Sequence, residues 1–304
     1  PGDPGTLDVV VVGGGPTGVE TTGALAELMH ALQQTGRLER PGQITIVDRG
    51  KALLAPFSSE SHEYSHRKLT EAGAVVRLET GVSAVHADRV EFDDSSTIPA
   101  RTTVWGGGES GAAIAQNAGP APGHGGRLDV RPDLTVEGYP GVYAVGDVAN
   151  IPSGDDTGRP LPQLGSVAQQ SGRWAAENIL RELRDEPVKS FKYKDKGIMA
   201  MIGRNAAVAE VGKHHHQVEG PVAFAAWLGV HAMLLSGAHS KADAFLNWAW
   251  DYFDRDHAAT VEVRHHVDAV VLRRTVGQRE LPVVLHRLSR GHAVHVRQQM
   301  AIGV

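Results

Sequence analysis

LDVVVVGGGPTGVE, residues 7–20, is the stretch of sequence that decides the fold of this chain. An apolar run ends in the spacing G-x-G-x-x-G, which is typical of a buried parallel strand that turns sharply into a helix. The first glycine permits the turn, the second lets backbone N–H groups approach a pyrophosphate, and the third lets the helix pack on the strand. Because the positive end of the helix faces the phosphates, we expect dinucleotide contacts at Gly13, Gly15, Pro16, Thr17 and Gly18.

The sequence around this motif alternates between strand and helix patterns. Apolar runs and amphipathic stretches predict the order βαβαβ, one nucleotide-binding half of an α/β fold, over residues 7–12, 18–32, 44–48, 62–72 and 74–79. Residues 82–92 predict a small antiparallel pair, and residues 101–105 a returning strand. These patterns indicate a Rossmann-like domain over residues 1–104.

Asp48, at the end of the second predicted strand, bears on the choice of dinucleotide. A carboxylate there accepts hydrogen bonds from ribose hydroxyls and repels a 2′-phosphate, which favours NADH over NADPH. The spacing from Gly18 is longer than usual, because residues 33–43 are inserted, and the neighbouring Arg49 could instead accept a phosphate. We therefore predict NADH and keep NADPH as the alternative.

A second group of residues follows the linker at residues 119–126. Residues 141–145 predict a buried strand, and Gly146 and Asp147 come directly after it. Pro162 precedes a long predicted helix, residues 164–183, whose positive end would face whatever lies above the sheet. On the residues alone, Asp147 is either a ligand-binding carboxylate or a loop aspartate that caps a helix.

Composition narrows the chemistry further. The 304 residues are 41% hydrophobic and include 36 glycines, which suits an α/β protein of two domains. The formal charge of -5 gives no electrostatic footprint for a nucleic acid. There is no cysteine, so disulfides and thiolate chemistry are excluded, and any electron transfer needs a bound cofactor.

Several motifs together resemble one family. GGGPTGVE, YAVGDVA, FKYKDKGIMAMIGRNAAVAEVG, WLGVHAMLLSG and FLNWAWDYF occur in the order and spacing of type II NADH:quinone oxidoreductases, most like the actinobacterial members. The resemblance covers about residues 6–260 and implies a nested flavoprotein fold with two dinucleotide-binding (Rossmann-like) parts, in which the N-terminal βαβ for FAD would be missing from this chain. It also implies a C-terminal part of the FAD domain over residues 105–190. A hairpin region and C-terminal amphipathic helices would follow over residues 191–260, and then a tail, residues 261–304, that is compatible with disorder.

The resemblance also implies site residues. FAD would contact Gly108, Gly146, Asp147, Leu164 and Gly165, with Asp147 on the ribityl chain and the following helix facing the flavin. Glu20 and Lys196 would approach each other beside the cofactors and the quinone and would hold or relay protons. Gln170 matches the last glutamine of the quinone-side motif A-Q-x-A-x-Q, whereas Ser166 replaces the first. On the residues alone, Glu20 is an acid in a first helical turn and Lys196 a solvated lysine.

Two further predictions concern the surface and metals. Aromatic residues concentrate in the predicted helices 222–235 and 242–253, which the family uses to rest on the membrane, so the resemblance implies a peripheral protein at the cytoplasmic face of the cell membrane. Core packing or a homodimer contact are the alternatives. His214, His215 and His216 are adjacent and cannot converge on one ion, so we predict a solvated loop and no metal site.

The sequence thus predicts an enzyme that passes hydride from NADH to FAD and electrons on to a membrane quinone, without pumping protons. Two alternatives remain open. One is another FAD/NAD(P)H reductase of the same nested fold, such as a ferredoxin or disulfide reductase. The other is an NADH-binding but catalytically incomplete fragment, and on this expectation the chain purified alone would be colourless.

Overall fold

The structure of this chain is a computed structural model. It describes residues 5–38, 41–154, 158–212, 215–235 and 237–253, together with the backbone of three strands within residues 262–285. Two compact units are distinguished, the first comprising Pro1–Gln33 and Leu38–His231 and the second Gln34–Arg37 and Ala232–Val304. They are described separately.

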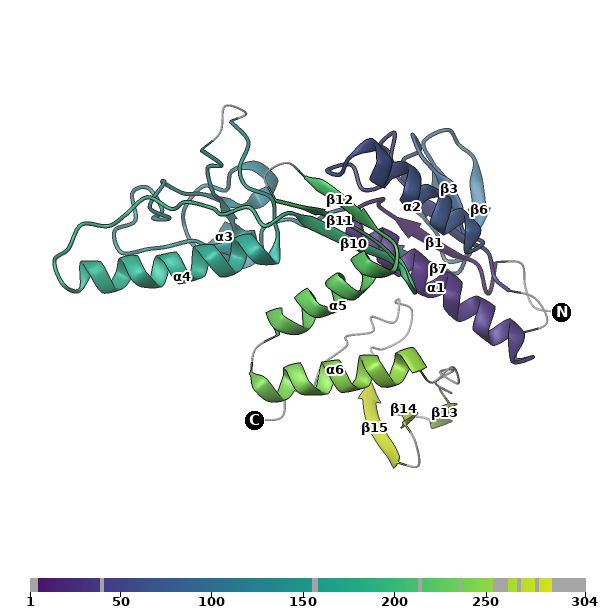
Figure 1. Cartoon of the computed structure of the whole chain (residues 1–304). Helices are drawn as coiled ribbons and strands as arrows, with labels where there is room; N and C mark the ends of the chain where they lie inside the picture. Colours follow the sequence, from purple (N-terminus) through teal and green to yellow (C-terminus); the bar gives the residue numbers. More distant parts are fainter. Residues whose placement is uncertain are drawn as a thin grey trace. The chain divides into compact units, whose positions relative to one another are not determined.

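A four-stranded parallel sheet forms the centre of the nucleotide-binding half (Figure 1). The sheet order is β3-β2-β1-β7, built from β1 (Val9–Val12), β2 (Ile44–Val47), β3 (Val75–Arg77) and β7 (Thr102–Trp105). All four residues of β1 and of β2 are buried, as expected for strands covered on both faces. The predicted α/β class is confirmed, and the boundaries of these strands lie within two residues of those expected.

Helices cover one face of this sheet and a small antiparallel sheet covers the other. The helices are α1 (Pro16–Gln34) and α2 (Ser59–Glu71), and Val11 and Ile46 lie in the core on their side. On the other side Val10 and Val12 pack with residues of β4 (Val82–Val85), β5 (Arg89–Phe92) and β6 (Thr97–Pro99). The antiparallel pair expected over residues 82–92 therefore has a third strand.

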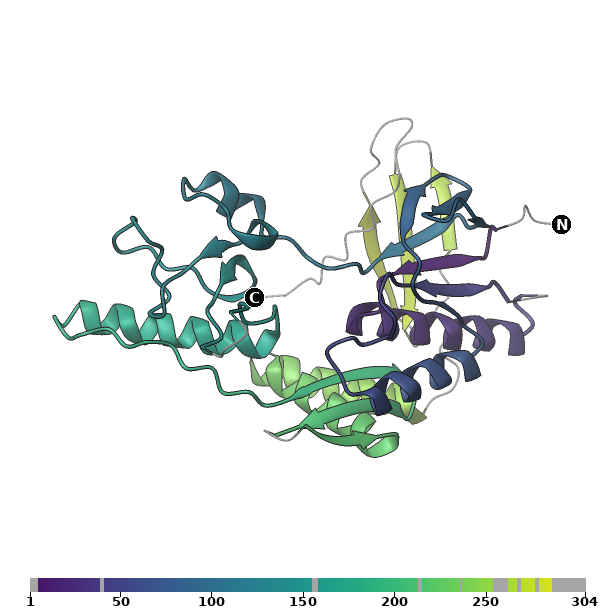
Figure 2. The same ribbon diagram turned by 90° about the horizontal axis from the view of Figure 1, so that it is seen from above.

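A second antiparallel sheet packs on the helices. It contains β10 (Ile198–Gly203), β11 (Ala206–Val211) and β12 (His216–Glu219) in that order. Ala200, Ile202 and Val208 belong to the same core as α1 and α2, so the helices lie between the parallel sheet and this hairpin sheet (Figure 2). Of the hairpin region expected over residues 191–211, residues 198–211 form the hairpin β10–β11, residues 191–197 form no strand, and β12 adds a third strand.

The region from residue 105 to 190 is mostly irregular around one long helix, α4 (Gly165–Glu182). Its other elements are short: α3 (Ala113–Asn117), η1 (His124–Gly126), β8 (Leu128–Asp129), η2 (Gly146–Val148) and β9 (Ala149–Asn150). The buried strand expected over residues 141–145 was wrong in part. Ala144 is buried, but the only ladder contact described there is an isolated bridge between Thr135 and Tyr143. A run of apolar residues becomes a strand only when a neighbour pairs its backbone groups.

The last elements are helical and then extended. α5 (Pro221–Leu234) follows β12, and α6 (Ala238–Phe253) lies in the second unit with β13 (Glu262–His266), β14 (Ala269–Val276) and β15 (Arg279–Leu285). These three strands form an antiparallel sheet inside the predicted tail, and residues 286–304 lie outside the described residues. Among the helices that the structure describes, none combines the length and apolar character needed to cross a bilayer.

Candidate functional site

The glycine turn between β1 and α1 has the geometry that its spacing predicts. Gly13 has φ +108°, and a Cβ on it would lie 2.4 Å from the carbonyl oxygen of Gly106. A Cβ on Gly18 would lie 1.8 Å from the carbonyl oxygen of Gly13, so the helix starts in direct contact with the turn. Gly15, in contrast, faces open space. Neither a side chain on Gly13 nor one on Gly18 fits, while the backbone of Gly15 is free to meet a ligand.

The amino end of α1 supplies the donors of this site. The first helical turn is closed by the N–H of Val19, which donates to the carbonyl oxygen of Gly15 at 3.0 Å. The N–H groups of Thr17 and Gly18 precede that bond and have no acceptor within the helix, and Pro16 has no N–H to leave unpaired. This end of the helix can therefore bind an anion.

Asp48 holds the turn in place from the end of β2. Its Oδ2 accepts a hydrogen bond from the N–H of Gly14 at 2.6 Å, and its Oδ1 accepts one from the N–H of Gly50 at 2.6 Å. Gly14 is fixed a second time, because its carbonyl oxygen accepts a bond from the N–H of Leu54 at 2.7 Å. The carboxylate is therefore oriented beside the turn, as expected for the acid that reads a ribose.

Glu20 lies one turn further along α1, at the hairpin sheet. Its Oε1 accepts hydrogen bonds from the N–H of Met201 at 3.1 Å and from the indole N–H of Trp227 at 3.0 Å. Burial raises the pKa of Glu20, and the bonds from Met201 and Trp227 and the charge of His231 only partly oppose that rise. This carboxyl group consequently holds a proton to a higher pH than an ordinary glutamate.

The same face of α1 holds the hairpin at two further points. A Cβ on Gly23 would lie 1.7 Å from the carbonyl oxygen of Ile202, and Glu27 accepts a hydrogen bond from the N–H of Arg204. Our interpretation of the sequence missed Glu27, Gly23 and Trp227. The spacing of seven residues between Glu20 and Glu27, which places both on one helical face, was the available signal.

Lys196 stays a predicted neighbour of Glu20. Its side chain is exposed two residues before the start of β10, and no ion pair joins it to Glu20 among the residues that the structure describes. Oε1 of Glu20 accepts two N–H groups, one from β10 and one from α5.

Gln170 uses its whole amide group to hold the segment before the hairpin. Its Nε2 donates to the carbonyl oxygen of Lys194 at 3.1 Å, and its Oε1 accepts from the N–H of the same residue at 3.0 Å. Ser166, where the family motif has glutamine, forms a hydroxyl–hydroxyl bond with Tyr193 at 2.9 Å. With Trp174 and Asn178, which bond to Lys189, they form one polar face of α4, residues 166, 170, 174 and 178.

The residues expected to meet a flavin lie at the amino end of α4 and in two loops. The carboxylate of Asp147 is exposed, and the N–H of Gly146 donates to Oγ of Ser171 on α4 at 3.1 Å. Leu164 is the N-cap of α4 and provides no side-chain cap, while Gly165 and Gly108 both face open space. An uncapped helix end, a free carboxylate and uncrowded glycines fit the hydroxyl and carbonyl groups of a flavin.

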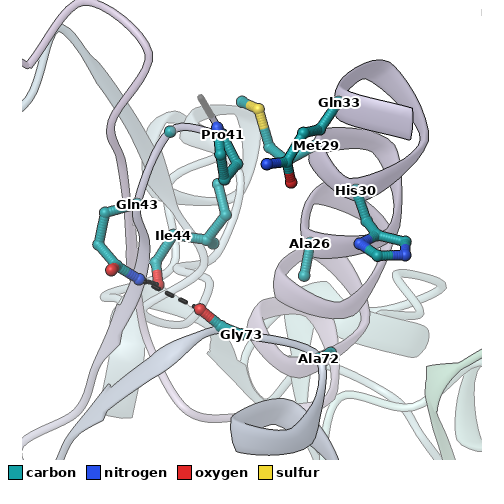
Figure 3. A pocket seen from close by; sticks show the side chains of 10 residues that line it. Ala26, Met29, His30, Gln33, Pro41, Gln43, Ile44, Ala72 and Gly73 are labelled. Carbon is teal, nitrogen blue, oxygen red and sulfur yellow. Dashed lines mark hydrogen bonds between the residues drawn. The ribbon is translucent and has the colours of Figure 1, made fainter. Parts of the chain in front are cut away.

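Two surface cavities lie away from the residues that we expected to bind the cofactors. A cavity of about 270 Å³ is lined by Ala26, Met29, His30, Gln33 and residues at the start of β2 (Figure 3). It lies at the amino ends of the parallel strands, opposite the edge where such sheets bind ligands. Another, of about 420 Å³, lies beside Gly23, Lys68 and Arg204. Among the described residues no cluster of His, Cys, Asp or Glu suits a metal ion, and His214 lies outside them.

Comparison with known proteins places the chain in a family. Residues 3–172 match the sequence profile of the pyridine nucleotide-disulphide oxidoreductases. The type II NADH:quinone oxidoreductase NdhA of Mycobacterium tuberculosis is 32% identical over 265 residues, which are 82% of this chain and 54% of that protein. The type II NADH:quinone oxidoreductase of Staphylococcus saprophyticus is 31% identical over 67% of this chain and 52% of its own length. The resemblance inferred from the motifs is confirmed.

A solved structure shares the fold. The structure of NDH2 from Plasmodium falciparum in complex with NADH has a TM-score of 0.73 at 18% identity, and the match covers 83% of this chain and 66% of that one. The Rossmann-like flavoprotein fold expected from the resemblance is thereby confirmed. The chain spans about half the length of the curated relatives that it matches. Its sequence profile, its fold and its relatives, all named as oxidoreductases, agree: the chain belongs to the pyridine nucleotide-disulphide oxidoreductase family.

Proposed function

We propose that this chain binds NADH at the turn Gly13–Gly18 and takes part in transferring its electrons, through FAD, to a membrane quinone without pumping protons. The observation that carries the proposal is the turn itself. Gly15 is open where a pyrophosphate would approach, the first N–H groups of α1 have no acceptor within the helix, and Asp48 is held beside the turn by the N–H of Gly14. The names of the curated relatives support this choice of electron donor and acceptor.

In this proposal the backbone binds the phosphates and Asp48 selects the sugar. The N–H groups at the start of α1 donate to the pyrophosphate. Each oxygen of Asp48 already accepts one backbone N–H, and each retains a second lone pair for a ribose hydroxyl. The negative charge of Asp48 disfavours the 2′-phosphate of NADPH.

FAD would be held by the residues at the amino end of α4. Asp147 offers an exposed carboxylate for the ribityl hydroxyls, and Gly108, Gly146, Leu164 and Gly165 present backbone groups to the flavin ring. When bound, the flavin supplies a two-electron carrier between nicotinamide and quinone. The uncapped end of α4 favours negative charge at the adjoining edge of the ring.

On the quinone side we assign roles to three residues. Glu20, whose pKa is raised by burial, holds a proton near the hairpin. Lys196 provides a positive charge in the segment before β10, and Gln170 positions that segment through Lys194. The alternative is a catalytically incomplete fragment. Such a protein would bind NADH, but one of these three residues would not act in quinone reduction.

Attachment to the membrane surface is part of the proposal. α5 and the residue that follows it expose apolar side chains, among them Val222, Val230, Met233, Leu234 and Leu235. In α6, Phe245 is 66% exposed and Leu246 is 65% exposed. Apolar and aromatic side chains of this kind suit helices that lie in the headgroup zone at the cytoplasmic face. A contact between two copies of the chain would use the same side chains.

Titration with NADH tests the first step. We expect saturable quenching of tryptophan fluorescence by NADH, and a dissociation constant about 10–100-fold larger in Gly15→Ala, whose Cβ would block the approach of the pyrophosphate. Gly172→Ala is the matched control, because Gly172 also faces open space but lies within α4. A well-folded chain that shows no saturable binding of NADH would refute the proposal.

Two further measurements separate its parts. Asp48→Asn should reduce the preference for NADH over NADPH, whereas Asp93→Asn, which also loses a charged bond to a glycine N–H, should not. Addition of FAD should turn the chain yellow and permit reduction of menadione by NADH. Binding of NADH without any flavin uptake would favour the incomplete fragment.

A further inference from the structure

The strongest unassigned cluster surrounds the carboxyl group of Glu20. Oε1 of Glu20 accepts both the N–H of Met201 and the indole N–H of Trp227, at 3.1 and 3.0 Å. Met201 belongs to β10 and Trp227 to α5, so the carboxyl group is held from two sides by elements about 180 to 210 residues further along the chain. Burial and the two donors hold this carboxyl group in one orientation. It can therefore give or take a proton only along that orientation.

His231 lies against the face of the indole of Trp227, whose edge N–H bonds to Glu20. Its ring stacks on Trp227 with centroids 3.9 Å apart and an angle of 26° between the planes. Its Nδ1 lies 2.8 Å from the carbonyl oxygen of Trp227. A carbonyl oxygen only accepts, so Nδ1 carries the hydrogen and Nε2 is left with the lone pair that takes up a proton.

We propose that Trp227 and His231 form a proton-holding cluster with Glu20, in which the indole is a positioning residue for the carboxyl group and the imidazole exchanges protons with water. This inference rests on the proposed function and names the residues that would supply its proton. Reduction of a quinone to the quinol takes two electrons and two protons. NADH delivers two electrons and one proton equivalent as hydride, so one further proton must come from water in each turnover.

The charges around Glu20 support this pairing. The titratable and charged side chains on these elements include Glu27 and His30 on α1, Glu210 on β11 and His231 on α5, with Arg204 at the hairpin turn and Lys196 before β10. Only the charge of His231 has a resolved effect on the pKa of Glu20, which it lowers. The charge of His231 therefore favours the ionised form of Glu20, although less strongly than the bonds from Met201 and Trp227 do.

Carbon-13 NMR of glutamate carboxyl groups in the full chain tests the cluster without requiring activity. The resonance of Glu20 is identified as the one absent from Glu20→Gln. In Trp227→Phe the carboxylate loses a donor, so its titration should move to higher pH. In His231→Gln it should also move to higher pH, because the charge that lowers the pKa of Glu20 is removed. This second variant keeps Trp227 and its bond to Glu20, and so tests the cluster if Trp227→Phe fails to fold.

Matched controls exist for each change. Trp174→Phe also removes an indole N–H bond, to the carbonyl oxygen of Lys189 at 2.9 Å, and Glu27→Gln also removes a carboxylate that α1 directs at the hairpin. Both should leave the titration of Glu20 as in the parent chain. An unchanged Glu20 titration in both Trp227→Phe and His231→Gln would overturn the proposal.

A second measurement separates this proposal from the proposed function. In the full chain supplied with FAD, stopped-flow absorbance follows reduction by NADH and reoxidation by menadione as two steps. Glu20→Gln should slow reoxidation by about 100-fold, and Trp227→Phe by about tenfold, as expected for one hydrogen bond to a charged group. Reduction by NADH should be unchanged in both. Equal slowing of both steps would overturn the proposal of the cluster. A chain that shows neither step would contradict the proposed function, and the NMR titration would then decide whether the cluster exists.

Discussion

Gly23 on α1 and Ile202 on β10 approach so closely that a Cβ built on the glycine would lie 1.7 Å from the carbonyl oxygen of Ile202. Glu20 and Glu27 bond to backbone N–H groups on either side of this contact, at Met201 and Arg204. The hairpin is therefore docked on α1 through backbone groups, and any side chain larger than a hydrogen atom at position 23 must displace it.

We predict that Gly23→Ala destabilises the chain by about 2–3 kcal/mol, because the methyl group forces the hairpin away from α1. Gly172→Ala on α4 should instead stabilise it by about 0.5–1 kcal/mol, since nothing lies near that glycine and alanine favours a helix. Urea unfolding followed by circular dichroism measures both. Similar stability of the two variants would contradict the close contact.

A second docking point predicts the behaviour of Ser58, the N-cap of α2. Its N–H and its Oγ each donate to Oε1 of Glu210 at 2.7 Å. Ser58→Ala removes the cap and one bond to a buried carboxylate, and should lower the free energy of unfolding by about 2 kcal/mol. Ser59→Ala, one residue away and bonded only to the exposed Glu60, should change it by less than about 0.5 kcal/mol.

Stability should depend on pH through Glu210. Burial raises the pKa of Glu210, but the bonds from Ser58 and Ser61 and the charge of His215 outweigh it and lower the pKa from 4.5. A depressed pKa stabilises the fold above the unfolded value, and this contribution is lost as the pH falls through the folded value. We expect the unfolding free energy to fall below about pH 4.5 less steeply in Glu210→Gln than in the parent chain. Parallel curves in urea titrations at several pH values would show that Glu210 makes no such contribution.

The polar face of α4 predicts a difference between two neighbouring glutamines. Gln170→Leu removes both bonds to the backbone of Lys194, so the chain should lose about 1–2 kcal/mol of stability. Hydrogen exchange should also rise at the N–H of Lys194. Gln169→Leu, at an exposed position on the same helix, is the control and should change neither quantity. If both variants exchange alike, α4 does not hold this segment.

The sequence predicted those elements whose conformation is determined by residues close together in the chain. The turn at Gly13 and Gly18 follows from glycine spacing and from an apolar strand, and both are contained in a dozen residues. α4 was predicted within one or two residues, because its apolar positions repeat with helical period. The strand expected at residues 141–145, which the structure does not form, shows the limit, since apolar character alone does not supply a pairing partner.

Contacts between segments that are far apart in the chain could not be predicted from the sequence. Ser58 and Glu210 are separated by 152 residues, and Glu20 and Trp227 by 207. Neither pair has a spacing rule that joins it, so the expected partner of Glu20 was Lys196 rather than Met201 and Trp227. The polar face of α4 at residues 166, 170, 174 and 178 was not predicted, because no local pattern identifies the backbone groups that these side chains hold.

α1 begins at the glycine turn and, within its first twelve residues, carries Glu20, Gly23 and Glu27 against the hairpin. Because α1 is one continuous helix, a tilt at the glycine turn also moves the residues that contact the hairpin. If a nucleotide binds at the turn as proposed, its binding and the docking of the hairpin act on the same helix. To the extent that binding stabilises the docked hairpin, thermodynamic reciprocity requires that loosening the hairpin weaken the binding of the nucleotide.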